Sequence, residues 1–242
     1  MARARMTRSE LKAQDEITTT LQSFGEMAIA RKKEVLAGAA IVVVVVVAFF
    51  GWRYYSAKQN AAAQVELGSV IASYRNPAIK SDQERNEKTI VEAQKALTDY
   101  PSARTAPVVR YYLALAQAGL GDMPNAVKNL EEVISRADTD TKPIAQFALA
   151  GIYKKQGDLQ KETDVLKQLE QSGGYSKSAV QFELAVATEA ANQKDQAQSY
   201  YGKVITDTPD SPFRADAEAA LKRMGLPLPA PPPPAPAAPV AK

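Results

Sequence analysis

The amino-acid sequence predicts an all-α protein, with one membrane-spanning helix near the N-terminus followed by a solenoid of paired helices. Two observations support this prediction. An uncharged, apolar run of 18 residues extends from Val35 to Trp52. In the chain after it, a helical pattern recurs at intervals of 36 and then 35 residues.

The apolar run has the length and composition of a transmembrane helix. A helix of 18 residues spans about 27 Å, close to the ~30 Å hydrocarbon core of a bilayer. Its centre holds six consecutive valines, which would favour a strand in water, but in lipid a helix satisfies its own backbone groups. Trp52, Tyr54 and Tyr55 follow at the depth of the membrane interface. We therefore expect a transmembrane helix over residues 35–55; the alternative is a buried core strand.

The basic residues predict the orientation of this helix. Two basic residues, Arg53 and Lys58, lie in the twenty residues after Trp52, whereas seven precede the run: Arg3, Arg5, Arg8, Lys12, Arg31, Lys32 and Lys33. The positive-inside rule then places residues 1–34 in the cytoplasm and the domain after the helix on the other side.

Two alternatives stay open at the N-terminus. A cleaved signal peptide would use the small residues 61–63, but the polar lead of 34 residues and the long apolar run favour an uncleaved anchor. Within the lead, residues 9–30 read either as an amphipathic helix lying at the membrane surface or as a loosely ordered tether.

The composition excludes several classes of chemistry. The chain has no cysteine and no histidine, so disulfides, thiolate nucleophiles, Ser-His-Asp triads and zinc sites that use these ligands are excluded. The formal net charge of +3 is too small and too dispersed to indicate nucleic-acid binding. These absences lower the expectation of an enzyme.

The repeat is defined by two markers that move in step. In three aligned blocks an aromatic residue moves from Tyr111 to Phe147 to Phe182. A leucine two residues later moves by the same intervals, and each block continues into a turn and a second helix. Because two independent markers shift by equal intervals, they indicate a true repeat rather than coincidence.

A helix–turn–helix unit of this length resembles the tetratricopeptide repeat. That family has a small residue on the first helix, glycine at the turn, alanine on the second helix and proline after it. Glycine at the turn can take a positive φ, and small residues allow close helix packing. The matching positions are Ala114, Gly121, Ala126, Ala150, Tyr153, Gly157, Ala185, Ala197 and Pro209.

The sequence also departs from the family pattern. The tryptophan position of the family holds Arg110, Gln146 and Gln181, and Glu162 stands where alanine is expected.

The repeats define a domain over residues 56–225, with about three to four repeats and a cap. A first, partial repeat would have helices near residues 58–75 and 90–97, and residues 213–224 form a final amphipathic helix that suits a terminal cap. Residues 226–242 are rich in proline and alanine and cannot build a core. This tail is either a spacer or a ligand for a proline-recognising domain.

The combination of one anchor and a short repeat array resembles a bacterial family. It is similar to the ancillary subunit of the Sec translocon, which shares its repeat domain with the cell-division coordinator CpoB. The residues that carry the resemblance are the apolar run ending at 51–55, the helix after it, and the repeats up to Gly225. The resemblance implies an inner-membrane protein whose periplasmic repeats meet translocating chains, with the SecYEG channel and periplasmic chaperones as partners.

The candidate binding residues lie on the first helices of the repeats. These helices line the concave groove of such arrays, and in the family register Tyr111, Phe147 and Phe182 face it. Lys154 and Glu189 lie about two turns further along. They would form an aromatic ladder for protein segments with charges at its rim. The alternative is that the aromatic residues pack one repeat against the next.

The function that follows is a membrane-anchored adaptor on the periplasmic side that binds proteins or translocating chains. No cofactor, metal, nucleic acid or small-molecule substrate is expected. The alternative is a scaffold for envelope assembly or cell division. An enzyme would need a convergent polar pocket, which the repeat register does not offer.

Overall fold

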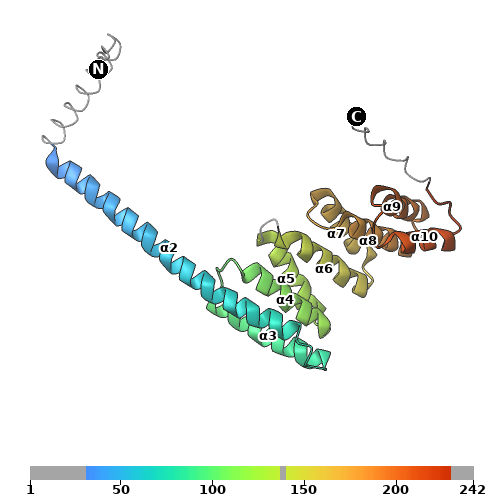
Figure 1. Cartoon of the computed structure of the whole chain (residues 1–242), viewed down its shortest axis with the longest axis horizontal. Helices are drawn as coiled ribbons and strands as arrows, with labels where there is room; N and C mark the ends of the chain where they lie inside the picture. The colour runs from blue at the N-terminus through green and yellow to red at the C-terminus, as the bar shows by residue number, and fades with distance from the viewer. Residues whose placement is uncertain (1–30, 137–139, 230–242) are drawn as a thin grey trace, which may run out of the picture. The chain divides into compact units, whose positions relative to one another are not determined.

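The computed structural model of the chain describes residues 31–136 and 140–229. Across these residues the secondary structure is helical, without strands, and successive helices pack as antiparallel pairs, the first of which includes the end of α2 (Figure 1). The predicted segment 9–30 and the tail beyond residue 229 lie outside the described residues. The chain divides into two units, residues 1–58 and 59–242.

The helices are short and evenly sized after the first. Their bounds are α2 Lys32–Tyr74, α3 Asp82–Asp99, α4 Ala106–Gly119, α5 Met123–Arg136, α6 Thr141–Gln156, α7 Leu159–Ser172, α8 Lys177–Ala190, α9 Lys194–Asp207 and α10 Arg214–Arg223. The pairs α4–α5, α6–α7 and α8–α9 correspond to the three repeats of the sequence. The all-helical repeat architecture predicted from the sequence is confirmed.

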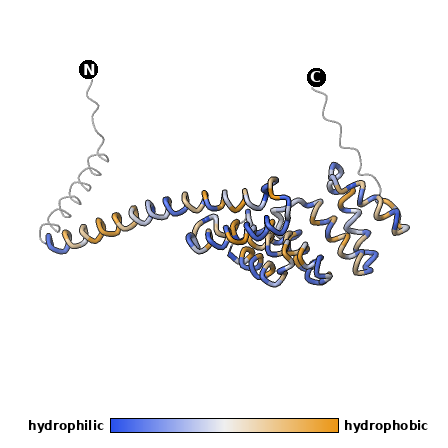
Figure 2. Tube along the Cα trace, turned by 90° about the horizontal axis from the view of Figure 1, so that it is seen from below, coloured by the Kyte–Doolittle hydropathy of each residue, from blue (hydrophilic) through white to orange (hydrophobic). Residues whose placement is uncertain are grey.

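Helix α2 has 43 residues and is continuous through the predicted membrane segment into the first repeat. Its apolar part is the orange stretch near its start in Figure 2. The described side chains between Leu36 and Tyr55 are exposed, and the helix is long and apolar enough to cross a membrane, with a mean hydropathy of 2.7 over its most apolar window. The transmembrane assignment of residues 35–55 stays a prediction.

The second half of α2 forms the first helix pair with α3. Val70 of α2 is buried with Ala93 of α3 and Leu113 of α4. Helix α2 ends at Tyr74, shortly before Pro77, and Ser81 caps α3 by accepting a hydrogen bond from the Glu84 N–H at 3.3 Å. The partial repeat inferred from the sequence is therefore a complete helix pair.

The turns within α4–α5, α6–α7 and α8–α9 share the same backbone hydrogen bond. The N–H of Asp122 donates to the Gln117 carbonyl at 2.9 Å. The equivalent bonds are Asp158 to Tyr153 at 3.0 Å and Gln193 to Thr188 at 2.9 Å. This six-residue closure requires a left-handed residue just inside it.

In two of these three turns the left-handed residue is the glycine that the sequence indicated. Gly121 has φ 84° and Gly157 has φ 74°, as predicted. The third turn uses Asn192 with φ 59°, a residue that tolerates this conformation better than most.

Small residues bring the two helices of a pair close together. Ala114 and Ala126 are fully buried in one core cluster, and Ala185 and Ala197 are fully buried in another. The last apolar face is covered by α10, whose Ala217 and Leu221 pack with Tyr201 of α9. The sequence predicts a cap over residues 213–224, and α10 lies within that range.

The turn geometry gives the first prediction. Replacing Gly121 with proline forces φ to about −65° and removes the N–H that donates to the Ala118 carbonyl at 3.2 Å. We expect Gly121→Pro to lower the free energy of unfolding by about 3 kcal/mol, measured by chemical denaturation.

The control is Gly151→Ala. Gly151 lies inside α6, and an added Cβ there meets nothing within 4 Å. It should stabilise the fold by up to ~1 kcal/mol. Equal stability of Gly121→Pro and the natural protein would contradict the turn assignment.

Candidate protein-binding site

The five residues predicted to bind a partner lie on the first helices of successive pairs. Tyr111 is on α4, Phe147 and Lys154 are on α6, and Phe182 and Glu189 are on α8. The three aromatic side chains are each half-buried. Their role in binding stays a prediction; the contacts that each makes are described below.

Tyr111 belongs to a row of tyrosines at the start of the solenoid. Its ring meets that of Tyr112 edge-on at 5.5 Å between centroids, and Tyr112 meets Tyr74 of α2 in the same way at 5.3 Å. Burial raises the pKa of Tyr111 to about 12, so its hydroxyl stays protonated at physiological pH. The row presents neutral aromatic surface.

The other two aromatic residues join neighbouring repeats by stacking. Phe147 stacks on Tyr175, which lies just before α8, with centroids 4.4 Å apart. Phe182 stacks on Phe213, which lies just before α10, at 5.1 Å. Both stacks have an interplanar angle of 20°. Neither Tyr175 nor Phe213 was among the predicted binding residues; an aromatic residue just before the next helix is the signal that points to them.

An open hollow of about 660 Å³ lies between α8 and α10, and we call it the α8–α10 hollow. Its lining combines apolar with charged side chains. Its lining residues include Phe182, Val186, Glu189, Tyr201, Asp216 and Arg223. It therefore brings together two of the predicted residues, Phe182 and Glu189.

Glu189 is held in place in the α8–α10 hollow by two donors. It accepts a hydrogen bond from the Tyr201 hydroxyl at 2.7 Å and from the Arg223 guanidinium at 2.7 Å. Burial acts to raise the pKa of the Glu189 carboxyl, but the two hydrogen bonds outweigh it and the pKa is lowered. The carboxylate is therefore charged and already paired.

A smaller hollow of about 70 Å³ lies between α6 and α8, and we call it the α6–α8 hollow. Its lining residues are Phe147, Ala150, Gly151, Lys154, Glu162, Leu166 and Glu183. Two of the predicted residues, Phe147 and Lys154, meet here. The Lys154 ammonium pairs with the Glu183 carboxylate at 2.6 Å.

Glu162 is the residue in this hollow that does not fit the surrounding packing. It occupies the alanine position of the second helix, is 1% exposed, and its Oε2 has no hydrogen-bond partner. Burial raises the pKa of its carboxyl and the neighbouring Glu183 adds to this, while Lys154 opposes it. The repeat thus buries a carboxyl group without a direct partner.

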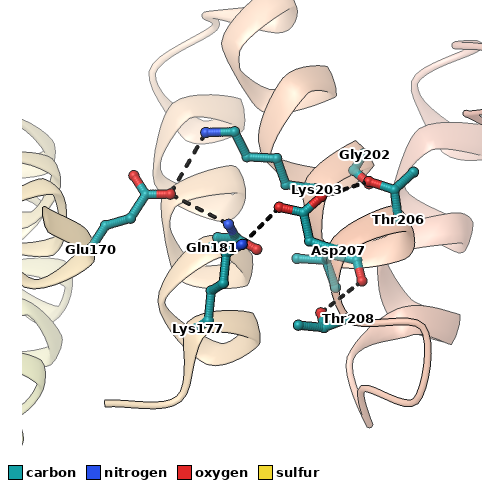
Figure 3. Close-up of polar contacts among 9 residues, drawn as sticks. Glu170, Lys177, Gln181, Gly202, Lys203, Thr206, Asp207 and Thr208 are labelled. Atoms are coloured by element: carbon teal, nitrogen blue, oxygen red, sulfur yellow. Dashed lines mark hydrogen bonds and ion pairs between the residues drawn. The ribbon is translucent and has the colours of Figure 1, made fainter. Parts of the chain in front are cut away.

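A polar network joins α7, α8 and α9. Figure 3 shows the Glu170 carboxylate of α7 facing both the Gln181 amide of α8 and the Lys203 ammonium of α9. The Gln181 amide donates to Glu170 at 3.5 Å, and the Lys203 ammonium lies 3.6 Å from it. Lys177 pairs with Asp207 at 2.9 Å. These contacts pair the charged groups of the network with one another, so we assign them a packing role.

The polar residues at the tryptophan position of the repeat have different partners. Arg110 pairs with Glu132 at 3.1 Å and donates to Asn129 at 3.1 Å. Gln146 and Gln181 are buried, and the Oε1 of each is unpartnered. No group of three or more acidic residues among the described positions is arranged to hold a metal ion.

Antiparallel helix pairs that repeat every 35 or 36 residues, with a left-handed turn and a terminal cap, define a helical-repeat solenoid of the kind that binds proteins. The chain belongs to the tetratricopeptide repeat-like domain family, whose profile matches residues 32–175. A tetratricopeptide repeat profile also matches residues 179–211.

Solved structures show the same fold at low sequence identity. One contains the nearly identical TPR-like repeats of a candidate kinesin light chain from Podosopora anserina, with a TM-score of 0.54 and 18% identity over 69% of this chain and 88% of that one. Another is MamA from Desulfovibrio magneticus RS-1, residues 41 to the end, with a TM-score of 0.52 and 14% identity over 67% and 85%. No curated protein is similar enough to count as a match.

The buried carboxyl group gives the second prediction. The pKa of the Glu162 carboxyl is higher in the folded protein than in the unfolded chain. At a pH above the unfolded pKa, folding therefore costs free energy, because the fold disfavours the ionised carboxylate. Below the unfolded pKa the carboxyl is protonated in both states and this cost disappears. We expect Glu162→Ala to raise the free energy of unfolding by ~1 kcal/mol near pH 8 and by less near pH 4.

The measurement is denaturation at both pH values, with Asp210→Ala, which removes an exposed carboxyl group, as the control. Equal changes at the two pH values would show that Glu162 does not titrate abnormally in the fold.

Proposed function

We propose that this protein is a membrane-anchored adaptor whose tetratricopeptide repeats bind protein partners at the outer side of a bacterial inner membrane. The observation that carries the proposal is that one uninterrupted helix, α2, contains both the apolar run and the first helix of the solenoid. An anchor continuous with the binding domain keeps that domain close to the membrane, which raises its effective concentration there.

The family match supports treating the apolar run and the repeats as parts of one domain. The profile begins at residue 32 and runs to residue 175, so a single family domain includes the apolar run and the repeats. The exposed valines and phenylalanines of the run, from Ile41 to Phe50, form more continuous apolar surface than soluble proteins normally leave in water. A lipid environment would accommodate them.

The two hollows support a protein as the ligand. Each combines apolar walls with a few charged groups, and both lie along first helices of the repeats. Aromatic side chains that are only half-buried, such as Phe147 and Phe182, provide apolar contact area at low entropic cost. Tetratricopeptide repeats are typically interaction scaffolds rather than enzymes.

The partner proposal rests on the resemblance and on charge. The basic residues before α2 favour a cytoplasmic N-terminus and a periplasmic repeat domain. In that arrangement the repeats would work as an accessory of the Sec translocon, linking the channel and emerging chains to periplasmic chaperones. A scaffold in envelope assembly or cell division is the alternative that the same architecture allows.

The anchor is tested by placing a charge in the apolar run. Arginine at the centre of a transmembrane helix costs ~2.5–3.5 kcal/mol in insertion, so Val45→Arg should move much of the protein from the membrane to the soluble fraction. The matched control is Val65→Arg, because Val65 is exposed on the same helix within the solenoid unit. Fractionation of cells measures both variants. If Val45→Arg and Val65→Arg fractionate identically with the membrane, the anchor assignment is wrong.

The partner is tested by cross-linking in intact cells. A photoreactive amino acid at Phe182, within the α8–α10 hollow, should trap Sec channel subunits, chaperones or secreted chains. The same amino acid at Val91, an exposed position on α3, is the control and should not trap them. Recovery of division or outer-membrane assembly proteins without channel subunits would favour the alternative scaffold.

A further inference from the structure

Counting α2–α3 as the first repeat, the third repeat is α6–α7. It differs from its neighbours at two positions that lie together. Where the second and fourth repeats have Ala126 and Ala197, it has Glu162. Where they have Leu115 and Val186 on the first helix, it has Gly151. Glu162 adds a carboxyl group to the interior. Gly151 removes a side chain from the first helix nearby. Both residues line the α6–α8 hollow.

Gly151 opens the hollow. A Cβ built at this position meets nothing within 4 Å, so the backbone does not require glycine for lack of space. Gly151 is in a helix, where glycine weakens the fold relative to alanine. A side chain such as that of Val186 would occupy the space that is left open.

Glu162 supplies the recognition group. It is 1% exposed, it lines the hollow, and its Oε2 has no hydrogen-bond partner among the described residues. A buried carboxylate is unfavourable unless a donor or a positive charge faces it. The two alanines at equivalent positions are fully buried without such a penalty, so packing alone does not explain the glutamate.

The charges around the hollow select a cation. Glu162 and Glu183 carry two negative charges when ionised, against one positive charge on Lys154. The Lys154 ammonium is paired with Glu183 at 2.6 Å, and the Oε2 of Glu162 is left without a hydrogen-bond partner. An anion would meet two carboxylates, whereas a cation would complete the pairing of Glu162.

The dimensions select a slender cation. A volume of about 70 Å³ corresponds to roughly two water molecules in the liquid, enough for an ammonium group and the methylene groups next to it. The ring of Phe147 forms part of the wall and provides a surface for those methylene groups and for the positive charge. A lysine side chain combines a single ammonium group with an apolar stem.

We propose that the α6–α8 hollow is a lysine-binding pocket, which takes the side chain of a lysine from a polypeptide held by the repeats. Glu162 accepts the hydrogen bond at the bottom of the pocket, Glu183 contributes at the mouth, and Gly151 leaves the entrance open. This proposal rests on the proposed function, because the lysine belongs to a bound protein chain.

The test compares two labelled peptides by fluorescence anisotropy with the full chain in detergent micelles. One peptide alternates leucine, serine and lysine, and its twin carries acetyl-lysine at every lysine. We expect the natural protein to bind the lysine peptide about tenfold more tightly, the size of one charge-assisted hydrogen bond.

Two variants isolate the pocket without weakening the fold. Glu162→Ala introduces the residue of the neighbouring repeats, and Gly151→Leu restores the residue type of Leu115. Both variants should have the melting temperature of the natural protein or a higher one. Their affinity for the lysine peptide should fall to their affinity for the acetyl-lysine peptide. Gly68→Leu, at an exposed glycine of α2 with open space around it, is the control and should preserve the discrimination.

The outcomes separate this proposal from the one on which it rests. If the natural protein binds both peptides equally, or if either pocket variant still prefers lysine, the lysine pocket is wrong and the repeats still bind chains. If the natural protein binds neither peptide, both the pocket and the binding of extended chains by these repeats are overturned.

Discussion

The close approach of the two helices within each repeat is the constraint on which the rest of the structure depends. At the crossing, alanine lies in the first helix and alanine in the second, as Ala114 and Ala126 show. A larger side chain at either position would push the helices apart and change the angle at which the next pair packs. The left-handed turn at Gly121 follows from the same requirement, because the chain must reverse within a few residues.

Aromatic stacking then connects one pair to the next. Phe147 on Tyr175 and Phe182 on Phe213 place a flat ring from a first helix against a ring that precedes the following one. These contacts bury part of each ring and leave part exposed. Packing and binding are therefore compatible roles for the same side chains, since a half-buried ring is rigid and still offers a face to a partner.

The third repeat shows how a regular architecture accommodates a local exception. Its helix pair keeps the turn hydrogen bond of the other repeats, from Asp158 to Tyr153, although Glu162 stands at the crossing. The hollow beside Gly151 and the half-exposed Lys154–Glu183 pair surround this exception. A position that violates the repeat pattern without disturbing the fold is where a specific function is most readily introduced.

The sequence by itself determined the class of fold, the helix pairs, the turns at Gly121 and Gly157, and the cap. These features follow from local rules: helical periodicity, the positive φ that glycine allows, and the small residues at the crossing. It also marked Glu162 as a departure, and it indicated the aromatic positions Tyr111, Phe147 and Phe182.

Only the tertiary structure decided the partners of those residues. It showed that Glu162 is buried and unpaired, that Lys154 reaches Glu183, and that Glu189 is held by Tyr201 and Arg223. Each of these contacts joins different helices, most of them from different repeats. They depend on the angle at which one helix packs against another, which many side chains set together and which no short stretch of sequence encodes.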